Sequence, residues 1–331
     1  MDYVLDPELA AVAPMIPALD FSDVAGVRAV AKAAMEAGQE YVSERPLSVE
    51  DVVLPANQDA PELRLRVYAP VDREGAIPGL LYLHGGGFVT GELSSVDNQC
   101  RRTADQTGVA VVNVGYRLAP ENPYPAALDD CHRALGWLAG EAGRSRGIDP
   151  ARLGVLGESS GGGLAAALAL VAKDRGGPAL AAQFLDAPTV DDRLGTDSMR
   201  DLPGTPTWNA ANSPYSWQYY LGDIARGGPD VPAYAAPARA KVEHLVGLPP
   251  AWVSAYQVDP TRDEGLDYAR HLIEAGVPTE LHHYAGAFHL AHFIPGTTIG
   301  ERLLTARLDA IRRLLPTPAG RAPQPPRPTA P

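Results

Sequence analysis

The sequence predicts an α/β protein with a mostly parallel central sheet that is covered by helices on both faces. Short apolar runs alternate with longer stretches of helical period through residues 49–315, which is the pattern of repeated strand–helix units. The apolar runs show little polar alternation, which indicates strands buried on both faces. With 331 residues, of which 45% are hydrophobic and 21% charged, the chain can bury a large core without disulfides or metals.

The expected elements follow one another in chain order. Two strand-like runs within residues 50–69 are placed at an antiparallel edge of the sheet. The buried strands are predicted at 78–83, 109–114, 153–156, 181–185 and 251–256. The helices are predicted at 125–139, 160–175, 264–275 and about 299–315. Two of them end at glycines, which permit a left-handed cap. Residues 1–40 are helical in pattern, and Ser22 is their expected N-cap.

The chain divides into three regions. We expect N-terminal cap helices in residues 1–45, a catalytic domain in residues 46–315 and a disordered Pro-rich tail in residues 316–331. A ligand for a proline-recognition module is the alternative for the tail. Residues 188–248 form a long aromatic-rich interruption between two strands. We predict a cap insertion at about 188–225, and the alternative is a surface excursion whose aromatic side chains pack on the core.

Composition excludes several functions. The formal net charge is −12, from 28 Lys+Arg against 40 Asp+Glu, and no basic cluster points to nucleic acid. Two cysteines cannot build a disulfide framework. The N-terminus lacks the basic start and apolar core of a secretory signal. No run of about 18 apolar residues predicts a membrane span. No nucleotide-binding motif occurs. We therefore expect a cytoplasmic protein without a nucleotide cofactor.

The strongest chemical signal is GESSG at residues 157–161, between a predicted strand and a predicted helix. This G-x-S-x-G pattern places Ser159 in a strained turn with its hydroxyl exposed, while the glycines let the strand and the helix pass closely. The helix N-terminus behind it favours an oxyanion. The alternative is a glycine-rich helix start without a nucleophile.

A second signal is HGGGF at residues 84–88, directly after another predicted strand. Three consecutive glycines let the backbone approach a reacting carbonyl, so that their N–H groups can join that of Ser160 in an oxyanion hole. The alternative for this segment alone is a flexible turn.

A serine nucleophile needs a base, and the base needs an acid that orients it. For this kind of turn the chain order is serine, then acid, then histidine. Asp259 ends a predicted strand, whereas Asp263 and Glu264 look like the first turn of a helix. His289 follows the strand-like run 279–284 and is the predicted base. The other candidate histidines lie inside predicted helices or strands: His271, His282 and His283.

A metal site is an alternative interpretation of the histidines near the C-terminal part of the sheet. They are His282, His283, His289 and His292. Their spacing matches no metal motif and no carboxylate lies among them, so we predict no metal.

Five separated motifs resemble the hormone-sensitive lipase family, the bacterial family IV carboxylesterases of the α/β-hydrolase fold. They are HGGGF, YRLAPENPYPAALDD, GESSGG, DPTRDEG and YAGAFH, and the resemblance covers roughly residues 45–315. The segment WNAANSPYSWQYYLG at 208–222 is also similar to the acyl-pocket and cap side of that family.

The resemblance implies roles for residues of this chain. Ser159 matches the nucleophile, Asp259 the acid and His289 the base. The implied oxyanion donors are Gly85, Gly86 and Ser160. The implied pocket residues are Phe88, Trp208, Tyr215, Trp217 and Leu290. A scaffold role is expected for Arg117, Pro120 and Glu121. The chain departs from the usual family pattern at Glu158, Ser160, Thr261 and Leu290.

The resemblance therefore implies a carboxylic ester hydrolase that needs no metal and acts on short- to medium-chain acyl esters. It also suggests a homodimer. Three alternatives stay open: a hydrolase of lactones, carbamates or amides; a thioesterase or acyltransferase; and a non-catalytic small-molecule receptor. The plant gibberellin receptors resemble this family but have lost the catalytic histidine. His289 stands in its motif here, which argues against the receptor.

Overall fold

A single eight-stranded sheet organises the chain in the computed structural model, which describes residues 3–36, 40–58 and 60–317. The strand order is β1-β2-β4-β3-β5-β6-β7-β8. The strands are β1 (Leu47–Leu54), β2 (Leu63–Pro70), β3 (Ile77–Leu83), β4 (Ala110–Gly115), β5 (Ile148–Glu158), β6 (Ala182–Asp186), β7 (Ala251–Val258) and β8 (Thr279–Phe288). Strands β3 to β8 run parallel, and β2 pairs antiparallel with both β1 and β4. The predicted sheet and its antiparallel edge are confirmed.

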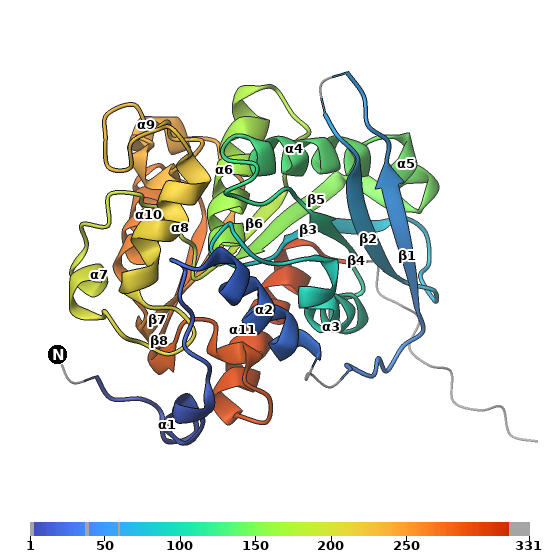
Figure 1. Cartoon of the computed structure of the whole chain (residues 1–331). Helices are drawn as coiled ribbons and strands as arrows, with labels where there is room; N and C mark the ends of the chain where they lie inside the picture. The colour runs from blue at the N-terminus through green and yellow to red at the C-terminus, as the bar shows by residue number, and fades with distance from the viewer. Residues whose placement is uncertain (1–2, 37–39, 59, 318–331) are drawn as a thin grey trace, which may run out of the picture.

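Helices cover both faces of this sheet (Figure 1). One face packs against α4 (Ala126–Ala139), α6 (Ser160–Asp174) and α10 (Arg262–Glu274), and the other against α3 (Asp97–Thr107) and α11 (Thr298–Leu314). Strand β3 is apolar throughout because its side chains enter both cores. Leu81 and Leu83 belong to the first core, whereas Leu80 and Tyr82 belong to the second. Successive side chains of a strand point to opposite faces, so a doubly covered strand is apolar throughout.

The remaining helices are α1 (Pro7–Val12), α2 (Val24–Glu36), α5 (Glu141–Ser145), α7 (Asp197–Asp201), α8 (Ser213–Leu221) and α9 (Val242–Leu245). Of these, α8 and α9 also contribute to the first core, through Trp217, Tyr220, Leu221 and Leu245. Short 3₁₀ turns occur at η1 (Ala13–Met15), η2 (Leu93–Val96), η3 (Ala210–Asn212), η4 (Pro237–Arg239) and η5 (Ala291–Phe293). Within the described ranges, no helix combines the length and apolarity that crossing a membrane requires.

Helix α2 corrects one expectation from the sequence. Ser22 is not its N-cap, because the helix begins at Val24 and the side chain of Asp23 accepts the N–H of Gly26. The hydroxyl of Ser22 instead donates to Asp20. The residue directly before the first helical residue is the one whose side chain can reach these N–H groups. The predicted Pro-rich tail lies outside the described residues from 318 onward.

Two glycines let β5 turn directly into α6. A Cβ added at Gly157 would lie 1.9 Å from the carbonyl oxygen of Gly161. A Cβ at Gly161 would lie 2.1 Å from the carbonyl oxygen of Leu83, on β3. Both obstacles are backbone atoms, which cannot rotate away. The turn that carries Ser159 therefore depends on the absence of these two side chains.

This packing makes a prediction about stability. Gly161→Ala should lower the free energy of unfolding by about 3 kcal/mol or more, because the clash is with backbone rather than with a flexible side chain. Gly136→Ala is the matched control, since Gly136 lies within α4 and no atom is found within 4 Å of its added Cβ. The control should gain up to about 1 kcal/mol from helix propensity. Urea unfolding measures both, and equal stabilities would contradict this account.

Candidate active site

Three predicted residues come together at one edge of the sheet. Ser159 follows β5, Asp259 follows β7 and His289 follows β8. These strands are parallel, so their carboxyl ends lie at the same edge, where α/β sheets carry their ligand sites. All three side chains are buried. Ser159 and His289 stand 130 positions apart in the sequence and come together because their strands end at the same edge of the sheet.

The three side chains form a continuous chain of hydrogen bonds. His289 Nε2 lies 2.8 Å from Ser159 Oγ, and His289 Nδ1 lies 2.6 Å from Asp259 Oδ2. Because a carboxylate oxygen can only accept, Nδ1 carries the proton that is donated to Asp259. Nε2 is then free to accept the hydroxyl proton of Ser159. The second carboxylate oxygen, Asp259 Oδ1, accepts from both the N–H and the hydroxyl of Thr261 at 2.8 Å.

The backbone of Ser159 is held in a strained conformation. Its φ is 56° and its ψ is −121°, a combination that residues other than glycine rarely adopt. The N–H of Ser159 donates to the carbonyl of Asp186 at 2.8 Å. Its own carbonyl accepts from Gly163 at 3.1 Å and from Thr189 at 3.0 Å. These bonds fix the turn on both sides of the serine.

The predicted oxyanion donors surround this turn. Gly85 lies beside Ser159, since a Cβ added at Gly85 would be 3.2 Å from the Cβ of Ser159. Gly86 has φ of 129°, and its carbonyl accepts from Val89 and Thr90. Ser160 is the first residue of α6. The N–H groups of Gly85, Gly86 and Ser160 donate to no acceptor among the residues that the structure describes. Unpaired N–H groups beside a nucleophile can bind an oxyanion.

The five predicted pocket residues occupy different surroundings. Trp208 has its ring 6.2 Å from that of His289, and Leu290 follows His289 with φ of 52°. Phe88 stacks on Tyr220, with ring centroids 4.0 Å apart, and also contacts Trp217. Phe88 and Trp217 therefore both belong to the main core. Tyr215 is 45% exposed on α8. Trp208 and Leu290 are therefore the two that adjoin the histidine.

A small apolar cluster covers the glycine turn. Phe21, just before α2, meets Trp208 edge to face with ring centroids 5.0 Å apart. A Cβ at Gly87 would lie 2.5 Å from Phe21 and 3.1 Å from Trp208. Val27 of α2 and Val89 complete the cluster. Segments nearly 200 residues apart in the sequence thus meet above HGGGF; the backbone N–H of Phe21 bonds the side chain of Asn212 across a separation of 191 residues.

The competing acids are accounted for elsewhere. Asp263 accepts from the N–H of Ser198 at 2.7 Å and from Arg262 at 2.7 Å. Glu264 accepts from the N–H of Val190 at 2.8 Å, and burial raises the pKa of this carboxyl well above its usual value. Asp259 is the acid that contacts His289.

The competing histidines also have other partners. His271 lies in α10 beside Arg270, and His282 lies on β8 with its Nε2 2.5 Å from Glu280. His283 occupies the following position on β8, where it is exposed. Among these four histidines, His289 is the one that contacts Ser159.

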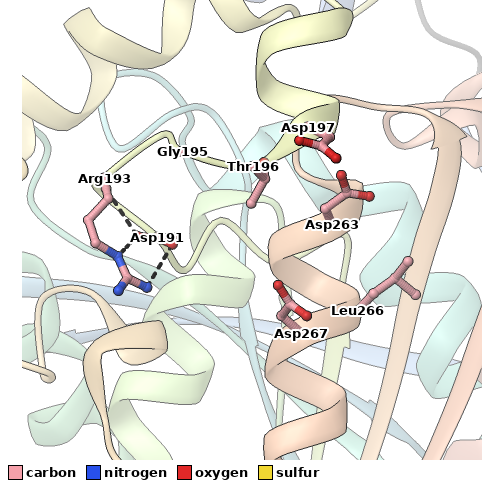
Figure 2. Close-up of a pocket in the computed structure, with 8 residues that line it drawn as sticks. All are labelled: Asp191, Arg193, Gly195, Thr196, Asp197, Asp263, Leu266 and Asp267. Atoms are coloured by element: carbon pink, nitrogen blue, oxygen red, sulfur yellow. Dashed lines mark hydrogen bonds and ion pairs between the residues drawn. The ribbon is translucent and has the colours of Figure 1, made fainter.

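A separate hollow of about 580 Å³ opens beside α7 and the first turns of α10. Figure 2 shows Asp191 paired with Arg193 on one side, and the carboxylates of Asp197, Asp263 and Asp267 on the other. Gly195, Thr196 and Leu266 complete its lining. None of the three hydrogen-bonded residues lines it, so it is distinct from their site.

The structure brings further residues to this site that the sequence left without a role. Thr207, with φ of 61°, places its hydroxyl 2.6 Å from the carbonyl of His289 and 2.7 Å from that of Pro206. Arg307 is buried and contacts Glu158, which directly precedes Ser159. One signal was available for Arg307, because it stands on the otherwise apolar face of the last helix with Leu304 and Leu308.

Comparisons with known proteins found similar chains among the esterases. A family model described as alpha/beta hydrolase fold matches residues 80–293. Esterase LipI of Mycobacterium tuberculosis is 40% identical over 226 residues, which are 68% of this chain and 69% of that protein. The ethyl acetate hydrolase of Pseudomonas putida is 35% identical over 255 residues, or 75% and 76% of the two chains. A bacterial heroin esterase structure superposes with a TM-score of 0.89 at 42% identity, covering 94% of this chain and 98% of its own.

The first residue of HGGGF generates a prediction about pH. His84 is fully buried, its Nδ1–H donates to the carbonyl of Gly85 at 2.8 Å and its Nε2 has no partner among the described residues. Burial lowers the pKa of His84 to about 4. The unfolded chain, with an ordinary pKa of about 6.5, therefore binds a proton that the folded protein does not.

Stability linked to His84 is thus present above about pH 6.5 and is lost as the pH falls toward about 4. Lowering the pH from about 7.5 to about 5 should therefore lower the free energy of unfolding by about 2 kcal/mol through His84 alone. His84→Gln should remove that part of the pH dependence. Urea unfolding of both proteins at the two pH values measures the difference, and an unchanged pH dependence would contradict the buried neutral imidazole.

Proposed function

The chain belongs to the α/β-hydrolase family and is a carboxylesterase, and we propose that it cleaves short- to medium-chain acyl esters with Ser159 as nucleophile. The observation that carries the proposal is the pair of contacts at His289, 2.8 Å to Ser159 and 2.6 Å to Asp259. A nucleophile, a base and an orienting acid at such distances are what acyl transfer through a serine requires.

The first half of the reaction forms an acyl-enzyme. His289 Nε2 removes the hydroxyl proton while Ser159 Oγ attacks the ester carbonyl. Asp259 keeps the imidazole in the required tautomer and stabilises the imidazolium. The N–H groups of Gly85, Gly86 and Ser160 receive the negative charge that develops on the carbonyl oxygen. His289 then gives its proton to the leaving alcohol, and the acyl group stays on Ser159.

The second half repeats the same steps with water. His289 takes a proton from a water molecule, which attacks the acyl carbonyl, and the same donors hold the new oxyanion. Collapse of this intermediate returns the proton to Ser159 Oγ and releases the carboxylic acid. All the groups needed for both halves belong to this chain, and no step requires a metal or an organic cofactor.

We propose that residues 1–45 and the insertion at about 188–225 form a cap that limits the acyl chain. In support, Phe21 and Trp208 pack together over Gly87, and the ring of Trp208 lies near His289. The name of one relative, ethyl acetate hydrolase, also points to a small ester. A cytoplasmic location and a homodimer stay predictions from the sequence.

Labelling with an organophosphate tests the nucleophile. Paraoxon should add the mass of one diethylphosphoryl group to the wild-type protein, on the peptide that contains Ser159, and none to Ser159→Ala. Ser159→Ala and His289→Ala should each lower kcat by a factor of about 10⁴ or more, because residues of such a triad act as one unit. Mass spectrometry and steady-state kinetics measure the two effects.

Two controls sharpen this test. His282→Ala removes a histidine that contacts Glu280 rather than Ser159, and its kcat should stay within about twofold of wild type, since it lies outside the reacting atoms. Circular dichroism shows whether each variant is folded. Equal labelling of wild type and Ser159→Ala would mean that another residue is the nucleophile.

Acyl-chain length tests the substrate class. With a series of p-nitrophenyl esters, kcat/KM should be highest for acetate to hexanoate and should fall by about tenfold or more for the longest chains, since each excluded methylene forfeits apolar burial. Faster hydrolysis of a long-chain triacylglycerol than of a butyrate ester would overturn the proposed cap. Activity on esters of any length would leave the proposed nucleophile intact.

A further inference from the structure

A cluster of buried polar side chains lies directly behind the nucleophile turn. Glu158, Asp186, His292 and Arg307 are all buried. Arg307 Nη1 lies 2.5 Å from Glu158 Oε1 and 3.0 Å from Asp186 Oδ2, so one guanidinium nitrogen bridges two carboxylates. The carboxylates have neutral partners as well. Tyr82 donates to Glu158 at 2.6 Å, while Ser254 and Tyr256 donate to Asp186 at 2.5 Å.

Each member of the cluster is tied to a part of the candidate active site. Glu158 is the residue before Ser159, and the carbonyl of Asp186 accepts the N–H of Ser159 at 2.8 Å. His292 stands three residues after His289, with its Nε2 3.1 Å from Glu158 Oε1. Arg307 comes from α11, on the far side of the sheet from α6. Arg307 therefore joins the nucleophile turn and the end of β6 directly to α11, and reaches the histidine loop through Glu158.

The cluster has its own cation. The ligand atoms of Glu158, Asp186 and His292 lie within 4.8 Å of one another, as the ligands of a metal ion would. Arg307 Nη1 lies at hydrogen-bond distance from both carboxylates and fills that place. Burial alone would raise the pKa of Glu158, but the charge of Arg307 and the hydrogen bonds from His292 and Tyr82 outweigh it and hold the pKa at about 2. Glu158 is therefore ionised at neutral pH.

Stability alone does not account for such a cluster. Buried ion pairs recover their desolvation cost only with good geometry, and apolar side chains of similar volume often stabilise a fold as well or better. A strained residue such as Ser159, in contrast, keeps its conformation only when its surroundings hold it from several sides. The cluster holds the residue before Ser159 through the side chain of Glu158. It also holds Asp186, whose carbonyl accepts the N–H of Ser159.

We propose that Arg307, by bridging Glu158 and Asp186, is a positioning residue that holds Ser159 Oγ in line with His289. The inference rests on the proposed roles of Ser159 and His289. Through the contact of Glu158 with His292, the same bridge steadies the loop that carries His289. Because a displacement of about 1 Å at a reacting atom can cost about a hundredfold in rate, loosening this bridge lowers kcat without removing any group that touches the substrate.

Three variants separate positioning from stability. Arg307→Met removes the bridge and leaves two buried carboxylates without a cation. The triple variant Glu158→Gln, Asp186→Asn, Arg307→Met removes all three charges, so no unpaired charge remains. Arg307→Lys keeps the charge but lacks the planar fork that suits two carboxylates. For each variant, Tm, kcat and KM are measured. The kcat is expressed per active site, with the active sites counted by titration with paraoxon.

Positioning predicts a definite pattern. Arg307→Met should lower Tm, and should lower per-site kcat by about 10- to 100-fold while KM stays within about threefold. The triple variant should regain Tm but not kcat, because charge balance returns and the bridge does not. Arg307→Lys should fall between wild type and Arg307→Met in kcat.

Arg239→Met is the matched control. Arg239 Nε lies 2.5 Å from the buried Asp192, in a pair that joins segments of the long insertion rather than the strand ends. This variant should have a lower Tm than wild type, whereas its per-site kcat should stay within about twofold of the wild-type value. A similar loss of per-site kcat in Arg239→Met would mean that any buried pair affects the site, and would overturn the specific role of Arg307.

The outcomes distinguish this inference from the proposed function. If paraoxon fails to label Ser159 in the wild type, the proposed nucleophile is wrong. If the wild type is labelled but the triple variant has wild-type kcat per site, Arg307 serves only charge balance and the inference is wrong. Should Arg307→Met not fold, the triple variant and Arg307→Lys decide the question, and wild-type per-site kcat in both would overturn it.

Discussion

The backbone conformation of Ser159 is the constraint on which the rest of the site depends. A residue at φ of 56° and ψ of −121° has no intrinsic reason to stay there, so each neighbour must contribute to holding it. Glycines at 157 and 161 let β5 and α6 approach closely enough to make the turn. Hydrogen bonds from β6 and the segment after it then fix both sides of the peptide. This conformation places the buried hydroxyl beside the N-terminus of α6, where negative charge is favoured.

Parallel strand order converts this local turn into a site. Strands β5, β6, β7 and β8 are consecutive neighbours in the sheet, so the loops after them lie side by side at one edge. Asp259 and His289 need only end their strands at the right place to reach Ser159. The sheet also explains the buried cluster, because Glu158 and Asp186 end β5 and β6 as paired neighbours. One arginine from α11 can therefore reach both carboxylates and hold two strand ends together.

The sequence predicted the parts of this site that local patterns encode. Apolar runs located the strands, and the residues just beyond them, Ser159, Asp259 and His289, met in the structure as expected. Arg307 was missed because its partners stand 149 and 121 positions away, and periodicity says nothing about such contacts. Thr207 was missed for the same reason, since its acceptor on His289 belongs to a distant loop. Among the pocket residues, spacing could not tell the core position of Trp217 from the exposed position of Tyr215.

The apolar cluster over the glycine turn and the position of His289 depend on the same loop. Gly87 has no side chain, and Phe21 and Trp208 occupy the space that one would fill. The same loop that carries Trp208 places the hydroxyl of Thr207 against the carbonyl of His289. A change in this cluster should therefore act on the position of the imidazole as well as on the width of the proposed acyl pocket. In the proposed reaction His289 acts on Ser159 and then on the leaving alcohol, so mutations in this loop should affect kcat and KM together rather than substrate binding alone.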